Sequence, residues 1–338
     1  MLFATAIVFV ALVTIEVSAR LYFAIRNGSS PTVDLHAYWV EDPDAGYGLK
    51  PGYSVGGIRI NSLGFRGPEV SRERVDGVQR IATLGDSTTF GPREDECAYP
   101  YLLPDLVGPR RVEVINAGVE GYRSDRALVH PQRDVMPLHP DIVTVFIGWD
   151  DLYQTNPFAD SQQLAMQASP LQRVLSWSTT AQAFRQLYYQ HLASHLELNS
   201  ANDSARLALL QSYRPQAFAD RLQRIIKAAR DGGAEVVLFT WPTVLGPEMS
   251  TAELARVVYP YYTHSLAELQ ALYADYQTIV REVAEEDQVQ VIDVAAWFDA
   301  SNKADLFVDT LHVTCAGHAL AADRLAPVLA ADLETLGR

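Results

Sequence analysis

The chain has 338 residues, of which 48% are hydrophobic and 20% charged, and its formal net charge is −14 at pH 7. An ordinary apolar fraction and only two cysteines exclude a disordered, collagen-like or disulfide-scaffold protein. The acidic balance, without any cluster of Lys and Arg, argues against a nucleic-acid partner.

The N-terminal segment is the most apolar part of the chain. Leu2–Ala19 contains one charged residue, Glu16, and as a helix it would extend ~27 Å, close to the thickness of a bilayer core. Arg20 lies four residues after Glu16, so the two side chains can pair on one helical face. Residues 17–19 resemble a signal-peptide cleavage site, but no positively charged stretch precedes the apolar run. We therefore predict that residues 1–26 form a retained, single-pass transmembrane helix.

The next segment, residues 27–70, is rich in Gly, Pro, Ser and Asn, as in Pro51-Gly52 and Gly56-Gly57. Such pairs mark turns. We predict a juxtamembrane lead-in of turns, with room for a hairpin, before the main domain at residues 71–338.

The main domain alternates short β-branched runs with helical patterns. Helical periodicity occupies 217–229, 269–284 and 317–329. This alternation predicts an α/β fold with a parallel, doubly wound sheet of about five strands. The predicted strands are Arg80–Leu84, Val112–Ile115, Ile142–Ile147, Glu235–Phe239 and Val289–Ile292.

Two connections are longer than a crossover requires. Residues 152–234 are largely helix-forming, and we predict a helical insertion there. Residues 243–265 contain Tyr259, Tyr261 and Tyr262; we favour packing under a long loop over a substrate wall for these rings.

Cys97 and Cys315 lie far apart in the sequence and form no CxxC motif, so neither a zinc site nor a thioredoxin-type motif is encoded. We predict two buried free thiols, with a disulfide as the alternative if the domain lies outside the cytoplasm.

Reactive side chains follow the predicted strands, at the sheet edge where α/β proteins place their sites. Ser87 follows the first strand, and Asp309 and His312 follow the last. A histidine can remove the proton of a serine nucleophile, while an aspartate orients the imidazole. Backbone N–H groups at Ser87 and Gly121 would suit a developing oxyanion. Ser87 taken alone is equally well explained as a helix N-cap, because Asp86-Ser87-Thr88 can start a helix.

Five sequence blocks resemble those of the SGNH hydrolases, the GDSL esterase/lipase family. They are Ile81–Gly91 (IATLGDSTTFG), Ile115–Gly121 (INAGVEG), Gly148–Asp151 (GWDD), Asp309–His312 (DTLH) and the lead-in Asn61–Gly67 (NSLGFRG), which resembles that of membrane-anchored members. The resemblance covers roughly residues 60–330 and implies a flavodoxin-like, three-layer α/β/α fold. Ordered blocks are much more specific than a single GDS motif.

The resemblance implies that Ser87 is the nucleophile, His312 the base, Asp309 its orienting partner, and that Ser87 and Gly121 donate to the oxyanion. It also implies an asparagine at position 150, where this chain has Asp150. An ionised carboxylate repels an oxyanion, and losing one donor costs about 100- to 1000-fold in rate. Three outcomes are open. Burial and the neighbouring Asp151 keep Asp150 protonated and able to donate; Asp151 or a main-chain amide donates in place of Asp150; or the enzyme is weak or inactive.

The sequence thus predicts a membrane-anchored serine esterase without metal or cofactor, which cleaves or transfers an acyl group, such as acetyl, of a carbohydrate or lipid ester. One alternative is a catalytically impaired binding or accessory protein, suggested by Asp150. A third hypothesis, less favoured, is a metal-dependent hydrolase. Its candidate ligands are Asp86, Asp150, Asp151, Asp309 and His312.

Two observations favour opposite orientations of the predicted transmembrane helix. Arg20 and Arg26 follow the apolar segment and no Lys or Arg precedes it, which by the positive-inside rule favours a cytoplasmic domain. The resemblance to anchored family members implies an extracytoplasmic catalytic domain, and this is the orientation we expect.

Overall fold

The computed structural model describes residues 11, 13–22, 38–108, 111–155, 157, 180, 207–208, 210–211, 213–299 and 302–336. The chain divides into two units. One comprises Met1–Trp39 and Phe158–Asn202, and the other comprises Val40–Pro157 and Asp203–Arg338. All the predicted site residues belong to the second unit.

A five-stranded, fully parallel sheet lies at the centre of the second unit, in the order β6-β5-β7-β8-β9. Its strands match the five predicted runs, and β5 and β7 are almost completely buried, as expected for strands covered on both faces. The strands are β5 (Gln79–Gly85), β6 (Val112–Gly118), β7 (Ile142–Phe146), β8 (Glu235–Phe239) and β9 (Gln290–Ile292).

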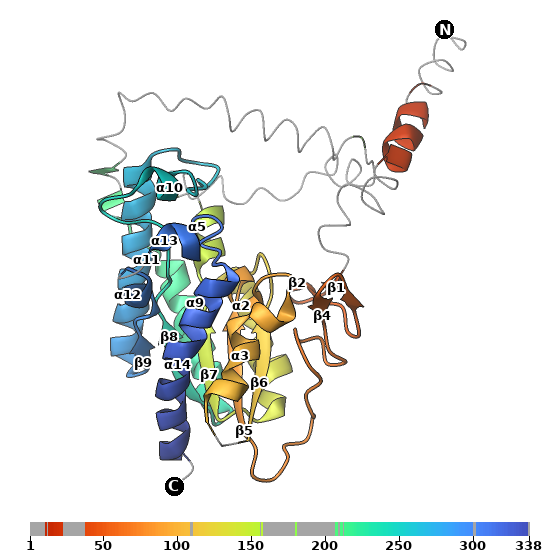
Figure 1. The fold of residues 1–338 in the computed structure, drawn as a ribbon, viewed down its shortest axis with the longest axis vertical. Coiled ribbons are helices and arrows are strands. Elements are labelled where there is room, and N and C mark those ends of the chain that lie inside the picture. The colour runs from red at the N-terminus through yellow and green to blue at the C-terminus, as the bar shows by residue number, and fades with distance from the viewer. Residues whose placement is uncertain are drawn as a thin grey trace. The chain divides into compact units, whose positions relative to one another are not determined.

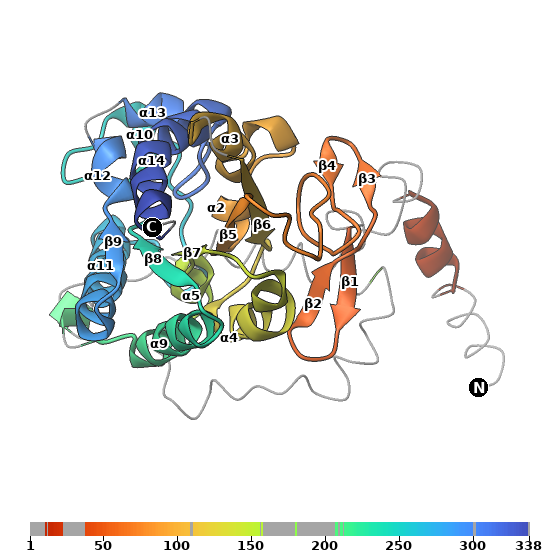
Figure 2. The same ribbon diagram turned by 90° about the horizontal axis from the view of Figure 1, so that it is seen from below.

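Helices cover both faces of this sheet. Helices α3 and α14 pack together on one face, and α9 and α11 pack together on the other (Figure 2). The three predicted helical stretches lie within α9, α11 and α14, so the doubly wound α/β prediction is confirmed. The longer helices are α3 (Tyr99–Leu106), α9 (Gln216–Asp231), α11 (Leu266–Asp287) and α14 (Cys315–Leu336). The short helices are α2 (Ser87–Phe90), α4 (Ser124–Ala127), α5 (Trp149–Gln154), α10 (Thr251–Leu254), α12 (Val294–Asp299) and α13 (Lys303–Leu306), with 3-10 or π turns at Asp95–Cys97, Pro131–Val135 and Met136–Leu138.

The lead-in folds into two small two-stranded sheets. One consists of β1 (Trp39–Asp42) and β2 (Gly46–Leu49), and the other of β3 (Ser54–Val55) and β4 (Ile58–Arg59). Buried Arg66 then donates to the carbonyl oxygens of Gly91 and Arg93, and its guanidinium lies 4.0 Å from the centre of the Phe90 ring. These contacts join the lead-in to the segment that follows α2.

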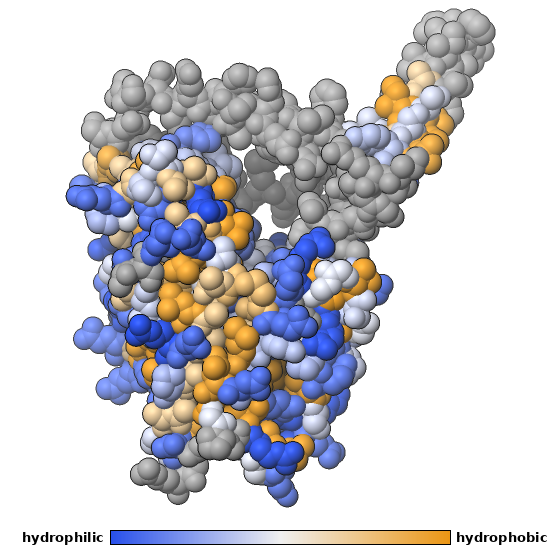
Figure 3. All heavy atoms as spheres, in the orientation of Figure 1, coloured by the Kyte–Doolittle hydropathy of each residue, from blue (hydrophilic) through white to orange (hydrophobic). Residues whose placement is uncertain are grey.

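Of the predicted anchor, residues 1–26, only residue 11 and residues 13–22 are described, and 13–22 are helical. Of the helices formed by the described residues, none is both long and apolar enough to span a bilayer. The helical residues carry exposed apolar side chains, among them Val13, Ile15, Val17 and Leu21 (Figure 3).

The predicted insertion at 152–234 is described only in part. Its C-terminal portion is α9, the crossover helix between β7 and β8, while most of residues 158–206 lie outside the described part of the chain. In the second long connection, Tyr262 is buried and its hydroxyl donates to the carbonyl of Leu152, which fits packing under a loop. Tyr261, in contrast, is exposed.

Candidate active site

The serine of the first block begins helix α2, directly after the buried strand β5. Asp86, and not Ser87, is the N-cap of this helix: its carboxylate accepts hydrogen bonds from the Thr88 N–H at 2.9 Å and the Thr88 hydroxyl at 2.7 Å. The N-cap explanation of Ser87 is therefore wrong. Helices α2 and α5 begin at the same end of the sheet, where the carboxyl ends of the strands meet (Figure 1).

Ser87, His312 and Asp309 form a continuous chain of hydrogen bonds. The Ser87 Oγ lies 2.8 Å from His312 Nε2, although 225 positions separate the two residues. On the other side of the ring, His312 Nδ1 lies 2.7 Å from Asp309 Oδ2. The second carboxylate oxygen of Asp309 accepts the backbone N–H groups of Leu311 and His312, at 3.0 and 2.9 Å. The carboxylate and the imidazole are thus held in one orientation.

The protonation of this chain follows from its surroundings. Burial alone would lower the pKa of His312, but the hydrogen bond and charge of Asp309, with the charges of Asp86 and Asp150, raise it above its ordinary value. Burial would raise the pKa of Asp309, but the hydrogen bonds and charge of His312, together with the Leu311 N–H, outweigh it, so the pKa of Asp309 is lowered. Asp309 is therefore ionised at neutral pH, and it stabilises a protonated His312.

Gly121 lies in the loop that follows β6. Its φ is +75°, a backbone conformation that side-chain-bearing residues rarely adopt. The loop is tied to β5, the strand that precedes Ser87, by a hydrogen bond from the Val119 N–H to the Gly85 carbonyl, at 3.1 Å. Next to it, the Asn116 amide donates to the Thr89 carbonyl at 3.1 Å. The first and second blocks therefore form one connected turn structure at the sheet edge.

The two aspartates of the third block have different surroundings. Asp151 is buried, and its carboxylate oxygens accept the backbone N–H and the hydroxyl of Ser124, both at 2.7 Å. Asp150 accepts a hydrogen bond from the Gln154 amide at 2.8 Å, and burial raises its pKa above the ordinary value. Both oxygens of Asp151 are thus engaged with Ser124, whereas Asp150 is hydrogen-bonded to Gln154.

The carboxyl group that interacts with Asp150 is that of Asp86. Asp86 is completely buried, and burial followed by the charge of Asp150 raises its pKa to about 7. One oxygen of Asp86 binds Thr88, while the other, Oδ2, is buried with no hydrogen-bond partner among the described residues. Two carboxyls in such a site favour the neutral form of one of them near neutral pH.

Among the described residues, no group of three or more His, Cys, Asp or Glu side chains could hold a metal ion. The carboxylates proposed for a metal-dependent hydrolase are instead engaged separately: Asp309 with His312, Asp151 with Ser124, and Asp86 with Thr88.

Cys97 and Cys315 form a disulfide, with 4.9 Å between their Cα atoms. The prediction of two free thiols is therefore wrong. Sequence spacing gave no indication of the pairing, because the fold brings the segment before α3 to the first residue of α14. Cys315 lies three residues after His312 in the sequence.

Tyr47 and Asp86 are the residues near the site whose surroundings the sequence did not reveal. The Tyr47 hydroxyl donates to the Glu120 carbonyl at 2.8 Å, next to Gly121. Tyr47 belongs to the lead-in, which the sequence blocks treat only as a preceding segment. Tyr47 comes close to Gly121 only through the fold of β1 and β2, which none of the sequence blocks covers.

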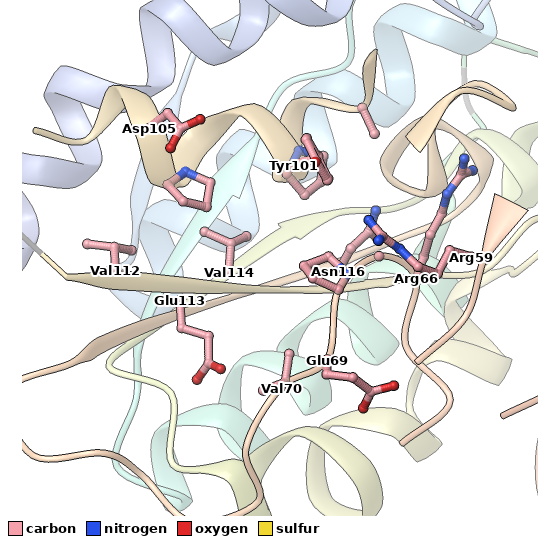
Figure 4. Close-up of a pocket in the computed structure, with 15 residues that line it drawn as sticks. Arg59, Arg66, Glu69, Val70, Tyr101, Asp105, Val112, Glu113, Val114 and Asn116 are labelled. Atoms are coloured by element: carbon pink, nitrogen blue, oxygen red, sulfur yellow. The ribbon is translucent and has the colours of Figure 1, made fainter. Parts of the chain in front are cut away.

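A separate pocket of about 400 Å³ lies at the edge strand β6, between the lead-in and α3. Figure 4 shows Asp105 and Tyr101 on one side of β6 and Glu69 and Glu113 on the other. Ser87 and His312 do not line it. This pocket is not part of the hydrogen-bonded chain described above.

Comparison with known proteins gives a family match from β5 to α14. The model of the GDSL-like lipase/acylhydrolase family matches residues 83–320, whereas no curated protein matches the chain. Similar solved structures include LAE5, an α/β hydrolase from the metagenome of Lake Arreo, Spain (18% identity, 75% of this chain and 94% of that chain, TM-score 0.47). Another is the acetylxylan esterase Axe2 from Geobacillus stearothermophilus (15% identity, 75% of this chain and 93% of that chain, TM-score 0.45). A third is the lipase/acylhydrolase from Enterococcus faecalis (19% identity, 75% of this chain and 96% of that chain, TM-score 0.43). On the match of the family model over residues 83–320, the chain belongs to the GDSL-like lipase/acylhydrolase family.

Proposed function

We propose that this protein is a serine esterase that hydrolyses or transfers the acyl group of a carbohydrate or lipid ester. The observation that carries the proposal is the hydrogen-bonded chain from Ser87 through His312 to Asp309. His312 Nε2 takes the proton as Ser87 Oγ attacks the ester carbonyl, and it then protonates the departing alcohol. Water, or the hydroxyl of an acceptor alcohol, releases the acyl group from Ser87 by the same proton transfers in reverse.

The oxyanion of the tetrahedral intermediate accepts hydrogen bonds from the N–H groups of Ser87 and Gly121 and from the carboxylic acid of Asp150. The third donor requires a protonated Asp150. The burial that raises the pKa of Asp150 supports this state. A neutral carboxyl donates one O–H, which is the function that an asparagine amide performs with its N–H.

A serine-directed fluorophosphonate probe tests the proposal. Wild type is labelled between about pH 5 and 9, the range in which a histidine base becomes neutral. Ser87→Ala abolishes labelling, while substitution of an exposed hydroxyl, Ser62→Ala, leaves it unchanged. Absence of labelling of the wild type throughout this range contradicts the proposal.

A second candidate function is that of an impaired, non-catalytic binding protein, and the observation in its favour is the carboxyl at position 150. Asp150→Asn separates the two. An increase in esterase rate of about 100-fold or more identifies an impaired site, because an ionised Asp150 would have opposed the oxyanion. Loss of activity identifies Asp150 as adapted to the reaction. A screen of short and long acyl esters and acetylated sugars, with Ser87→Ala as control, defines the acyl group and the alcohol.

We also propose that residues 1–26 anchor the protein in a membrane with the catalytic domain outside the cytoplasm. The apolar segment Leu2–Ala19 and the exposed apolar side chains of residues 13–22 support the anchor. The Cys97–Cys315 disulfide supports the location, since such bonds persist in oxidising compartments. Removal of residues 1–26 is expected to release the protein into the soluble fraction, and external protease is expected to reach the domain in intact cells. If the truncated protein stays bound to the membrane, the anchor proposal is wrong. If the domain is fully protected from external protease, the proposed location is wrong.

A further inference from the structure

The hairpin β1–β2, residues 39–49, lies outside the segment 83–320 that matches the family, yet one of its side chains reaches the candidate oxyanion site. The Tyr47 hydroxyl donates to the carbonyl oxygen of Glu120 at 2.8 Å. That carbonyl and the N–H of Gly121 belong to the same peptide group. Because a peptide group is planar, holding the C=O end fixes the direction of the N–H at the other end.

Gly121 also lies against the same tyrosine. A Cβ atom at Gly121 would lie 2.7 Å from the Tyr47 hydroxyl, and the φ of Gly121 is +75°. Both observations require glycine at position 121 while Tyr47 is in place. A hydrogen bond accepted by the carbonyl also polarises the peptide, which makes its N–H a stronger donor.

Tyr47 is itself held by several contacts. The Tyr122 hydroxyl donates to the Tyr47 carbonyl, and the two rings lie edge to face with centroids 5.2 Å apart. The Arg126 guanidinium lies 4.8 Å from the centre of the Tyr47 ring. At the other end of the hairpin, Asp42 accepts two hydrogen bonds from Arg133, at 2.6 and 3.0 Å.

The phenol of Tyr47 is protonated, as a hydrogen-bond donor must be. Burial raises the pKa of Tyr47, and the nearby carboxyls Asp150 and Glu120 raise it too, while Arg126 opposes them. The hydroxyl therefore keeps its proton throughout the pH range in which a histidine base works.

From these contacts we propose that Tyr47 is a positioning residue: its hydroxyl holds the Glu120–Gly121 peptide so that the Gly121 N–H points at the oxyanion. The β1–β2 hairpin is then a working part of the active site of this chain. The inference rests on the proposed esterase function and assigns to it a residue that lies 40 positions before the nucleophile.

Tyr47→Phe removes the hydroxyl and keeps the ring that packs against Tyr122 and Arg126. We expect kcat to fall about 10- to 100-fold, less than the loss caused by deleting an oxyanion donor outright, with KM unchanged. Affinity for a boronic acid, which forms a tetrahedral adduct with the serine, should fall by the same factor as kcat. Tyr53→Phe, which removes a phenol from the lead-in outside the hairpin, should leave kcat and boronate affinity at their wild-type values.

The results separate the inference from the function on which it rests. A Tyr47→Phe enzyme with wild-type kcat and boronate affinity overturns the inference and leaves the esterase function standing. Equal losses in Tyr47→Phe and Tyr53→Phe also overturn it, since they indicate a general effect of the lead-in. A wild type that neither turns over esters nor is labelled at Ser87 overturns the esterase function and this inference with it.

Discussion

Replacing Cys97 and Cys315 with serine removes the bond that closes a loop of 218 residues. In the chain-entropy treatment the bond reduces the entropy of the unfolded chain by about 18 cal/mol/K for a loop of this length, or about 5 kcal/mol at 25 °C. Natural domains have unfolding free energies of about 5–15 kcal/mol, so the expected loss is a third or more of the total. In temperature, this corresponds to a decrease in Tm of about 10 °C.

The same substitution should affect the reaction much less than the stability. The loop that carries His312 has backbone hydrogen bonds of its own: the Val308 N–H donates to the His312 carbonyl at 2.7 Å, and the Thr314 N–H donates to the Leu306 carbonyl at 2.8 Å. These bonds hold His312 while the protein is folded. We therefore expect the Cys97→Ser/Cys315→Ser double variant to react with a fluorophosphonate at a rate within about 10-fold of wild type at 25 °C, and to lose this reactivity at a lower temperature.

The assay is urea-induced unfolding followed by tryptophan fluorescence, with oxidised wild type, wild type in reductant and the double variant compared. Reduced wild type and the double variant should have the same lowered midpoint, and reductant should not lower that of the double variant further. Mass spectrometry of the oxidised wild type verifies the bond. A double variant as stable as the verified, oxidised wild type would refute the reasoning.

Three further substitutions test the site and its support. Asp309→Asn should lower kcat by about 10³- to 10⁴-fold and move the rising limb of the pH–rate profile to lower pH, because the carboxylate that raises the pKa of His312 is lost; an unmoved limb would contradict the assignment. Burial lowers the pKa of His318 from 6.5 to about 3, so between these pH values the unfolded chain binds a proton that the native state does not. The unfolding free energy should therefore decrease by about 1.4 kcal/mol for each unit by which the pH is lowered in this range. His318→Asn should remove this part of the pH dependence of urea unfolding. Gly148→Ala should lower the unfolding free energy by about 3 kcal/mol or more, since φ is +139° and the new Cβ would lie 2.0 Å from the Trp241 ring; a change below 1 kcal/mol in urea unfolding would be inconsistent with this.

The sheet could be predicted from the sequence because its strands carry their own signal. The run Ile142–Phe146 (IVTVF) consists of β-branched residues and a phenylalanine and is buried at every position, as expected for a strand covered on both faces. The loops after the strands were informative for the same reason, since a parallel sheet brings its carboxyl ends to one edge. Ser87 and His312 therefore lie together without any local pattern that relates them.

The pairings that the sequence did not reveal depend on which way a side chain points once the chain is folded. Asp150 and Asp151 are adjacent and chemically identical, yet Asp151 binds Ser124 while Asp150 binds Gln154 and its charge raises the pKa of Asp86. The sequence alone does not distinguish these two aspartates. The Cys97–Cys315 bond and the contact between Tyr47 and Glu120 are of the same kind, since each joins segments that only the tertiary fold brings together.

Position 150 illustrates how burial decides the chemistry of a residue type. As a free side chain, an aspartate in an oxyanion site is a defect, because it carries the same charge as the intermediate. Burial raises the pKa of Asp150, and burial together with the charge of Asp150 raises that of Asp86. A protonated Asp150 then has the one property that the site needs at that position, an O–H to donate. On this proposal the reaction requires a neutral His312 and a protonated Asp150 at the same time, so it is confined to the pH range in which both states coexist.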